Sequence, residues 1–316
     1  MQQRLIAGWG SVVLAALLAA CGSDPSQSDG VVAGPYVSAH RGAAAYAPEN
    51  TMMAFRNAAR LHVDDFETDA WQTADGVFVL LHDQTLSRTT DCSGLVTAKT
   101  YAALQACDAG YWFSPGQGTT SPDDALAHPA RGKGVKVPTA EELFAYAASF
   151  NGAYRPTVTI ELKNSLAAAR DAEALVSLIQ ASGIQDRIIV QSFSAIGIDR
   201  VKALDPTIRT LYLTSQVPGA EYALDYAERK GHDIVAPSAS LPEVDADYVQ
   251  RAHAAGKEVV PWTVDRLGDL QRLSEMNTDG LISNFPGCLL QLQSRLGVSR
   301  MLSGELDGDD SPICKS

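Results

Sequence analysis

The stretch at residues 65–83 reads DFETDAWQTADGVFVLLHD and holds two strand patterns, at 65–70 and 77–82. The gap between them is far too short for parallel strands, which need a crossover of about a dozen or more residues. Asp75-Gly76 in the gap is instead a hairpin turn signal. We therefore expect the second strand to run antiparallel to the first, outside the main order of strands.

Outward from this hairpin, short apolar runs alternate with helical patterns, which is typical of a parallel sheet covered by helices. Without the hairpin strand, eight strand patterns remain, and the sequence predicts an α/β fold of the (β/α)8 TIM-barrel type. The other strands are expected at 37–40, 157–162, 188–192, 210–213, 233–236, 258–264 and 280–283. The helices are expected at 51–61, 140–149, 167–181, 195–204, 222–230, 247–255, 267–276 and 288–296.

One long stretch, 108–138, departs from this rhythm because it is rich in glycine and proline and has little periodicity. Connections of this length usually have a function of their own. We expect a small insertion over the barrel mouth, with a passive surface loop as the alternative. The barrel domain is expected over 36–297 and a short tail over 298–316.

The N-terminus predicts export. Residues 1–20 hold one Arg, an apolar run and then small residues, which is the pattern of a secretory signal peptide. The run ends in Leu18-Ala19-Ala20-Cys21, which resembles a bacterial lipobox and implies cleavage before Cys21, lipidation of its thiol and membrane attachment. An ordinary signal with a chance cysteine is the alternative. Residues 21–35 have the composition of a flexible tether, and in a Gram-negative host Gly22 favours the outer membrane, facing the periplasm.

Composition and charge narrow the class of protein. With 46% hydrophobic and 20% charged residues, the chain can bury a large core, which excludes a disordered or collagen-like protein. It has 25 basic and 37 acidic residues, a formal charge of −12, so it should repel nucleic acid. An anionic substrate would then need concentrated positive charge or a bound metal ion.

Four cysteines besides Cys21 remain, namely Cys92, Cys107, Cys288 and Cys314. In an oxidising compartment they suggest two disulfides, with three connectivities open. Proximity in the sequence favours Cys92–Cys107 and Cys288–Cys314, and free buried thiols are the alternative.

Polar residues stand where several predicted strands end, which is where the active sites of barrels lie. Inward charges without partners are costly, and a metal ion would offset that cost. The residues at these strand ends are His40, Arg41, Glu67, Asp69, His82, Glu161 and Lys163.

Three of these residues, Glu67, Asp69 and Glu161, offer only oxygen ligands, which suit Ca²⁺ or Mg²⁺ rather than zinc. Arg41 and Lys163 offer donors suited to phosphate oxygens. Two histidines beside such a site are a natural acid and base. The residues alone thus predict metal-assisted phosphoryl transfer with a pair of histidines.

The order of these motifs resembles the glycerophosphodiester phosphodiesterase family over about residues 36–297. The early motifs that carry the resemblance are His40-Arg41-Gly42, Pro48-Glu49-Asn50-Thr51, Glu67-x-Asp69, Asp75-Gly76 and His82-Asp83. The later ones are Glu161-Leu162-Lys163, Trp262-Thr263-Val264 and Asp279-Gly280-Leu281-Ile282.

The resemblance implies metal-dependent hydrolysis of a glycerophosphodiester to glycerol 3-phosphate and an alcohol. His40 and His82 would be the catalytic pair, with His40 favoured as the base. One divalent cation would be held by the three carboxylates. Arg41 and Lys163 would bind the phosphate, and Trp262 would line the substrate pocket near Phe193.

Two alternatives stay open at this point. A phospholipase-like phosphodiesterase on the same barrel could act on lysophospholipids or phosphatidylinositol. The protein could also be a partner-binding surface lipoprotein with a vestigial site, although both histidines and all three carboxylates are present.

Two further positions are interpreted only locally. Residues 48–51 are expected to start a helix with Asn50 as its N-cap. The run Ser283-Asn284-Phe285-Pro286 departs from the family, in which Thr-Asp often precedes the aromatic residue. We expect this departure to touch none of the proposed chemistry.

Overall fold

The computed structural model describes residues 34–295 and 314–315. The predicted signal peptide, Cys21, nearly all of the tether and most of the C-terminal tail lie outside the described residues. The chain divides into two compact units, residues 1–33 and 34–316, and the fold below is that of the second unit. Among its described helices, none combines the length and apolar character that a bilayer crossing requires.

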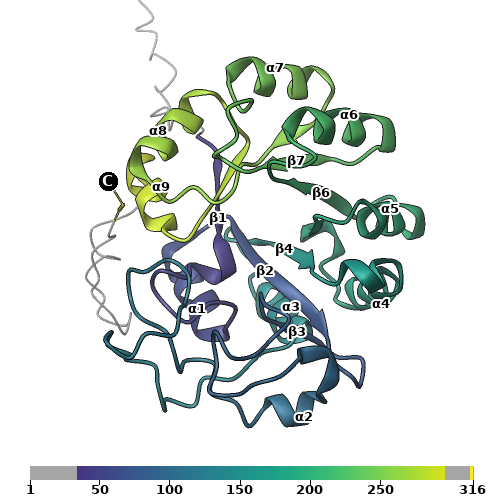
Figure 1. The fold of residues 1–316 in the computed structure, drawn as a ribbon. Helices are drawn as coiled ribbons and strands as arrows, with labels where there is room; N and C mark the ends of the chain where they lie inside the picture. Colours follow the sequence, from purple (N-terminus) through teal and green to yellow (C-terminus); the bar gives the residue numbers. More distant parts are fainter. Residues whose placement is uncertain (1–33, 296–313, 316) are drawn as a thin grey trace, which may run out of the picture. The chain divides into compact units, whose positions relative to one another are not determined.

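A nearly closed barrel of parallel strands forms the centre of this unit, and it confirms the predicted fold (Figure 1). The strands follow one another around the barrel in the order β8-β7-β6-β5-β4-β2-β1-β9. Their bounds are β1 (Tyr36–Ala39), β2 (Asp65–Gln72), β4 (Thr157–Leu162), β5 (Ile188–Ser192), β6 (Arg209–Thr214), β7 (Ile234–Pro237), β8 (Glu258–Val259) and β9 (Gly280–Ser283).

The short strand β3 (Phe78–Leu80) lies off this order and pairs antiparallel with β2, as the hairpin signal predicts. Gly76 in the turn has a φ of 85°, a left-handed conformation that glycine adopts without strain. Trp71 pairs with Val79 in the ladder. The hairpin therefore carries the chain back, so that His82 lies beside the residues at the end of β2.

Strand β8 is much shorter than the seven residues expected at 258–264. Pro261 has no N–H to donate to a ladder, so regular pairing ends early. Single backbone bonds continue beyond it: Val264 N donates to Ile282 O at 2.9 Å, and Ile282 N donates to Pro261 O at 3.1 Å. These bonds close most of the gap between β8 and β9.

Helices surround the barrel and bury apolar faces against its outer surface. The first helix begins after Thr51, whose side chain accepts from Ala54 N, so the prediction of Asn50 as N-cap is wrong. The last described helix ends at Leu292, before the predicted end at 296. The helix bounds are α1 (Met52–Leu61), α3 (Ala140–Ala148), α4 (Ala168–Ala181), α5 (Ala195–Leu204), α6 (Ala220–Lys230), α7 (Ala246–Ala254), α8 (Leu267–Glu275) and α9 (Pro286–Leu292).

A long excursion connects β3 to α3 and contains the predicted insertion together with the short helix α2 (Tyr101–Leu104). It has its own apolar cluster, which includes Leu86, Leu104 and Val137 and is separate from the main core. The excursion reaches the mouth of the barrel at Thr120, whose backbone N–H donates to Glu49.

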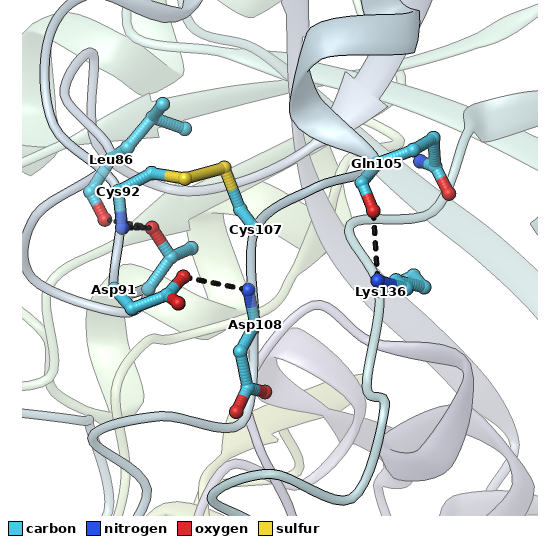
Figure 2. Close-up of a disulfide and its surroundings, with 8 residues drawn as sticks. Leu86, Asp91, Cys92, Gln105, Cys107, Asp108 and Lys136 are labelled. Atoms are coloured by element: carbon cyan, nitrogen blue, oxygen red, sulfur yellow. Dashed lines mark hydrogen bonds between the residues drawn. A yellow bond between two sulfur atoms is a disulfide. The ribbon is translucent and has the colours of Figure 1, made fainter.

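The structure contains two disulfides among its described residues, and they join the cysteines that sequence proximity favours. Cys92–Cys107 closes a loop inside the excursion, and Cys288–Cys314 joins α9 to the tail. Figure 2 shows hydrogen bonds beside the first disulfide: Asp108 N donates to Asp91 at 2.8 Å, and Lys136 Nζ donates to Gln105 O at 2.8 Å.

Removing the first disulfide should destabilise the protein without changing its fold. The bond joins cysteines 15 positions apart, and closing a loop of that size restricts the unfolded chain by about 3 kcal/mol. We expect a Cys92→Ala/Cys107→Ala variant to lose about that much free energy of unfolding in urea. An unfolding midpoint equal to that of the wild type would contradict this expectation.

Candidate active site

One pocket lies at the carboxyl ends of the barrel strands, and its lining contains most of the residues that the sequence predicts. The predicted lining residues are His40, Arg41, Glu67, Asp69, His82, Glu161, Phe193 and Trp262. Lys163 is not in the lining, but its ammonium contacts two of the pocket carboxylates. Gln191, Leu213, Thr263 and Ile282 complete the lining and were not predicted.

The turn after β1 places the first two of these residues. His40–Gly42 form a single 3-10 turn in which Arg41 has a φ of 52°, a strained conformation for a residue with a side chain. Gly42 also has a positive φ, and a Cβ there would lie only 2.8 Å from that of Ala54. The turn directs Arg41 N toward Glu67, to which it donates a hydrogen bond of 2.8 Å.

His40 is held by an amide rather than by a carboxylate. Its Nδ1 lies 2.8 Å from Asn284 Oδ1. Asn284 Nδ2 and N both donate to Asp265, at 2.8 and 2.9 Å, so the amide oxygen must face His40. An oxygen can only accept here, so His40 carries its proton on Nδ1 and leaves Nε2 with a free lone pair.

Burial, together with the charge of the neighbouring Arg41, lowers the pKa of His40 from 6.5 to about 3. The imidazole is therefore neutral at ordinary pH. The expectation that the departure at residues 283–286 touches none of the chemistry is wrong, because Asn284 fixes the tautomer of His40.

His82 follows β3 and has a charged partner. Its Nδ1 lies 2.7 Å from the Asp83 carboxylate, and its side chain is about one-third exposed. Burial lowers the pKa of His82, while Asp69 and Asp83 act in the opposite direction. The two histidines thus differ in their partners, one a neutral amide and the other an anion.

A buried carboxylate, Glu49, connects the two sides of the pocket. Its oxygens accept from Arg41 Nη1 at 2.8 Å and from Arg88 at 2.7 and 2.9 Å. Arg88 also donates to Asp83 at 2.7 Å and to Thr120 O at 2.8 Å. The guanidinium of Arg88 thereby links Asp83, which contacts His82, to Glu49, which contacts Arg41.

Arg88 lies in a stretch without periodicity, so its place in the site could not be predicted from the sequence. Asn50 was assigned the wrong role. Its φ is 57°, and its amide donates to Asp69 at 2.8 Å and accepts from Thr68 at 2.7 Å. It therefore orients a pocket carboxylate instead of capping a helix.

The sheet register brings the polar groups to one level of the barrel. Asp69 pairs with Glu161 across β2 and β4, and Glu161 pairs with Gln191 across β4 and β5. Glu67 lies two residues before Asp69 on the same face. Lys163 Nζ lies 3.1 Å from Glu161 and 3.4 Å from Asp69, so an ammonium balances the second and third carboxylates.

The charges on these carboxylates are unevenly balanced. Burial and the charge of Asp69 raise the pKa of Glu67 well above its usual range. Burial raises the pKa of Glu161 to about 8, although Lys163 opposes the shift. Burial would also raise the pKa of Asp69, but Lys163 and Arg41 outweigh it and hold that pKa well below its usual range.

The predicted metal ligands line one pocket without forming a closed cluster. Among the described residues, only Asp91, Cys92 and Cys107 have potential ligand atoms all within 4.8 Å of one another, and these cysteines are disulfide-bonded. The pocket nevertheless fits a divalent cation by its chemistry. A cation would relieve the repulsion that raises the pKa of Glu67, and Gln191 Oε1 is buried with no hydrogen-bond partner among the described residues.

The far wall of the pocket is aromatic, as expected. Phe193 lies edge-on to Trp262, with ring centroids 5.2 Å apart. The indole N–H of Trp262 donates to Ala236 O at 2.8 Å, which fixes the plane of the ring.

Comparison with known proteins agrees with this geometry. The model of the glycerophosphoryl diester phosphodiesterase family matches residues 40–288, more than half of the chain. The chain belongs to this family. As a family member it is a phosphoric diester hydrolase, as the sequence predicts.

Individual relatives match this chain over most of their own length. A glycerophosphodiester phosphodiesterase of Caldanaerobacter subterraneus is 30% identical over 264 residues, covering 83% of this chain and 98% of that protein. A Bacillus subtilis glycerophosphodiester phosphodiesterase is 28% identical over 256 residues, covering 78% of this chain and 83% of that protein. The structure of an Oleispira antarctica phosphodiesterase in complex with its product sn-glycerol-3-phosphate has 27% identity and a TM-score of 0.70, covering 83% and 97%.

Replacing Arg88 by Lys should impair this family member although Arg88 does not line the pocket. Lysine cannot reproduce a fork that binds Glu49, Asp83 and Thr120 together. We expect kcat/KM for a glycerophosphodiester to fall about 100-fold, the effect of misplacing a catalytic group by about 1 Å. The matched control is Arg251→Lys, because Arg251 pairs with two carboxylates on the surface. Equal activity of the two variants would show that Arg88 positions nothing.

Glu49 should stabilise the fold in a pH-dependent way. Although burial opposes it, Arg41 and Arg88 lower the pKa of Glu49 from 4.5 to about 2. A carboxyl whose pKa is lower in the folded state stabilises above its unfolded pKa and loses that effect as the pH falls through the folded pKa. We expect the free energy of unfolding of Glu49→Gln to be about 3 kcal/mol below that of the wild type at neutral pH. This difference between the two proteins should shrink below about pH 4.5. The measurement is urea unfolding of both proteins over this pH range. A difference in free energy of unfolding that stays constant down to about pH 3.5 would contradict this linkage.

Proposed function

We propose that the enzyme hydrolyses glycerophosphodiesters to glycerol 3-phosphate and an alcohol, using one divalent cation and the pair His40 and His82. The observation that carries the proposal is the unlike partnering of the two histidines that line one pocket. A neutral imidazole with a free lone pair can take a proton, and an imidazole beside a carboxylate can hold one until it is needed.

Glu67, Asp69 and Glu161 would hold the cation, either Ca²⁺ or Mg²⁺, with Gln191 as a further oxygen donor. When bound, the cation supplies positive charge that offsets the charge developing on the phosphate oxygens. The buried Arg41 Nε makes no hydrogen bond with the described residues, only an ion-pair contact of 3.3 Å with Asp69 Oδ2, so it can donate to a phosphate oxygen. Lys163 adds a second cationic donor beside the carboxylates.

In the proposed reaction, His40 Nε2 takes the proton from the attacking oxygen, and His82 donates a proton to the oxygen of the leaving alcohol. The glycerol 2-hydroxyl is the proposed attacking group, which gives a cyclic phosphate. Water then opens this ring, with the two histidines exchanging roles. Asn284 keeps the lone pair of His40 on Nε2, and Asp83 stabilises the protonated form of His82.

We further propose that the enzyme is exported and anchored to a membrane through lipidated Cys21. The two disulfides support an oxidising compartment, because such bonds are rare in the reducing cytosol.

The decisive test is release of glycerol 3-phosphate from glycerophosphocholine by residues 34–316, with Ca²⁺, with Mg²⁺ and with EDTA. We expect turnover with one of the ions and none with EDTA. His40→Ala should lower kcat by roughly 10²–10⁴-fold, since it removes the base. His253→Ala is the control, because that partly exposed histidine bonds Asp279, far from the pocket lining. Full turnover in EDTA, or full activity of His40→Ala, would refute the proposal.

A further inference from the structure

The barrel mouth carries exposed apolar side chains on one side. Leu166 is 97% exposed, Ile196 64% and Val217 86%. Leu166 lies in a 3-10 turn after β4, Ile196 in the first turn of α5 after β5, and Val217 in the loop after β6. We call these three side chains the apolar rim, and the connections that carry them the rim loops. Large apolar side chains with such exposure are unusual for a monomer's surface when they gather in one region.

The connections that carry the apolar rim hold one charged residue, Lys163, which directly follows β4 and pairs with the pocket carboxylates Asp69 and Glu161. Residues 164–169, 193–198 and 215–220 read NSLAAA, FSAIGI and SQVPGA, in a chain that is 20% charged. The strands β4, β5 and β6 are parallel neighbours, so all three loops leave the barrel at the same end. Figure 1 shows the helices α4, α5 and α6, which follow these loops, in succession around one side of the barrel.

The apolar rim is continuous with the catalytic pocket. Phe193, which lines the pocket against Trp262, stands three residues before Ile196 and is itself 45% exposed. The first two loops also touch: a Cβ placed on Gly197 would lie 3.6 Å from that of Ala168. An uncharged, partly apolar surface therefore extends from the pocket wall outward over adjacent loops.

We propose that the apolar rim docks the enzyme on the surface of a phospholipid bilayer, with the pocket facing the head-group layer. Leu166 and Val217 touch so little of their own protein that they cannot form the walls of a pocket for a single ligand. Separate protruding side chains fit a fluid layer, in which each is buried independently. The one charged residue of these connections, Lys163, is already largely buried and paired, so no exposed charge of theirs would have to be desolvated, which is the main cost of entering a bilayer.

The charge of the protein indicates which bilayer. A net charge of −12 is repelled by anionic lipids, and the one basic residue of these connections, Lys163, is already paired with two pocket carboxylates. The partner surface is therefore a zwitterionic bilayer, such as phosphatidylcholine. Docking of this kind is independent of Cys21 and of whether the proposed reaction takes place.

The test is co-sedimentation of residues 34–316 with phosphatidylcholine vesicles. This unit lacks residues 1–33, so their apolar run cannot contribute to binding. We expect the wild type to bind and the variant Leu166→Ser/Ile196→Ser/Val217→Ser to show a partition coefficient lower by about 100-fold or more, since three apolar side chains are lost. The control is Leu204→Ser/Leu292→Ser, which removes exposed leucines at the ends of α5 and α9, distant from the mouth.

Turnover of glycerophosphocholine, which is soluble, should be equal in the wild type and both variants, which also shows that they are folded. As a second measurement, Leu166→Trp should shift its fluorescence emission to shorter wavelength when vesicles are added. A wild type that stays in the supernatant, or a rim variant that binds as well as the wild type, would overturn the proposal. A rim variant that binds normally but loses turnover would assign the side chains to the substrate and would also overturn it.

If the proposed function fails, the wild type releases no glycerol 3-phosphate from glycerophosphocholine, while the vesicle result still decides the docking. The two failures are therefore distinguishable.

Discussion

The buried Glu49 carboxylate between Arg41 and Arg88 is the interaction on which the rest of the site depends. It joins two segments that are distant in the sequence, the one after β1 and the excursion after β3, and through Arg88 it is linked to Asp83, the carboxylate that holds His82. A buried charge is tolerated only when it is fully paired. Glu49, Arg41 and Arg88 therefore each constrain the positions of the other two, and the pocket is assembled as a unit rather than residue by residue.

The barrel mouth is divided into two chemically distinct halves. The charged half is built by the ends of β1, β2 and β4 together with the excursion, and it holds the histidines, the carboxylates and both arginines. The other half begins at Phe193 and Trp262 and continues into connections with exposed apolar side chains. A phosphodiester is itself divided in this way, with a charged phosphate and organic groups on either side. The division lets one pocket bind the anion while its outer edge meets a less polar surface.

Sequence patterns were sufficient for the barrel and for the set of residues at its mouth, because strand ends and the period of two are local properties. The hairpin at 65–83 decided the strand count, and the structure pairs it as expected. The partners of the pocket residues could not be predicted in the same way. Asn284 contacts His40 across 244 positions, and Arg88 contacts Glu49 across 39. Asparagine is common at helix N-caps, and only the tertiary contact of Asn50 with Asp69 reveals its real role.

The state of His40 can be measured most directly by the ¹⁵N chemical shifts of its ring in the folded enzyme, assigned by comparison with a His40→Gln variant. The contact with Asn284 and a pKa of about 3 predict a neutral ring with its proton on Nδ1, unchanged from about pH 5 to pH 8. The Asn284→Ala variant should lose this preference for one tautomer. A neutral ring with its proton on Nε2 would contradict the assignment of His40 Nε2 as the base. A ring that titrates near the ordinary value of about 6.5 would contradict the effect of burial on its pKa.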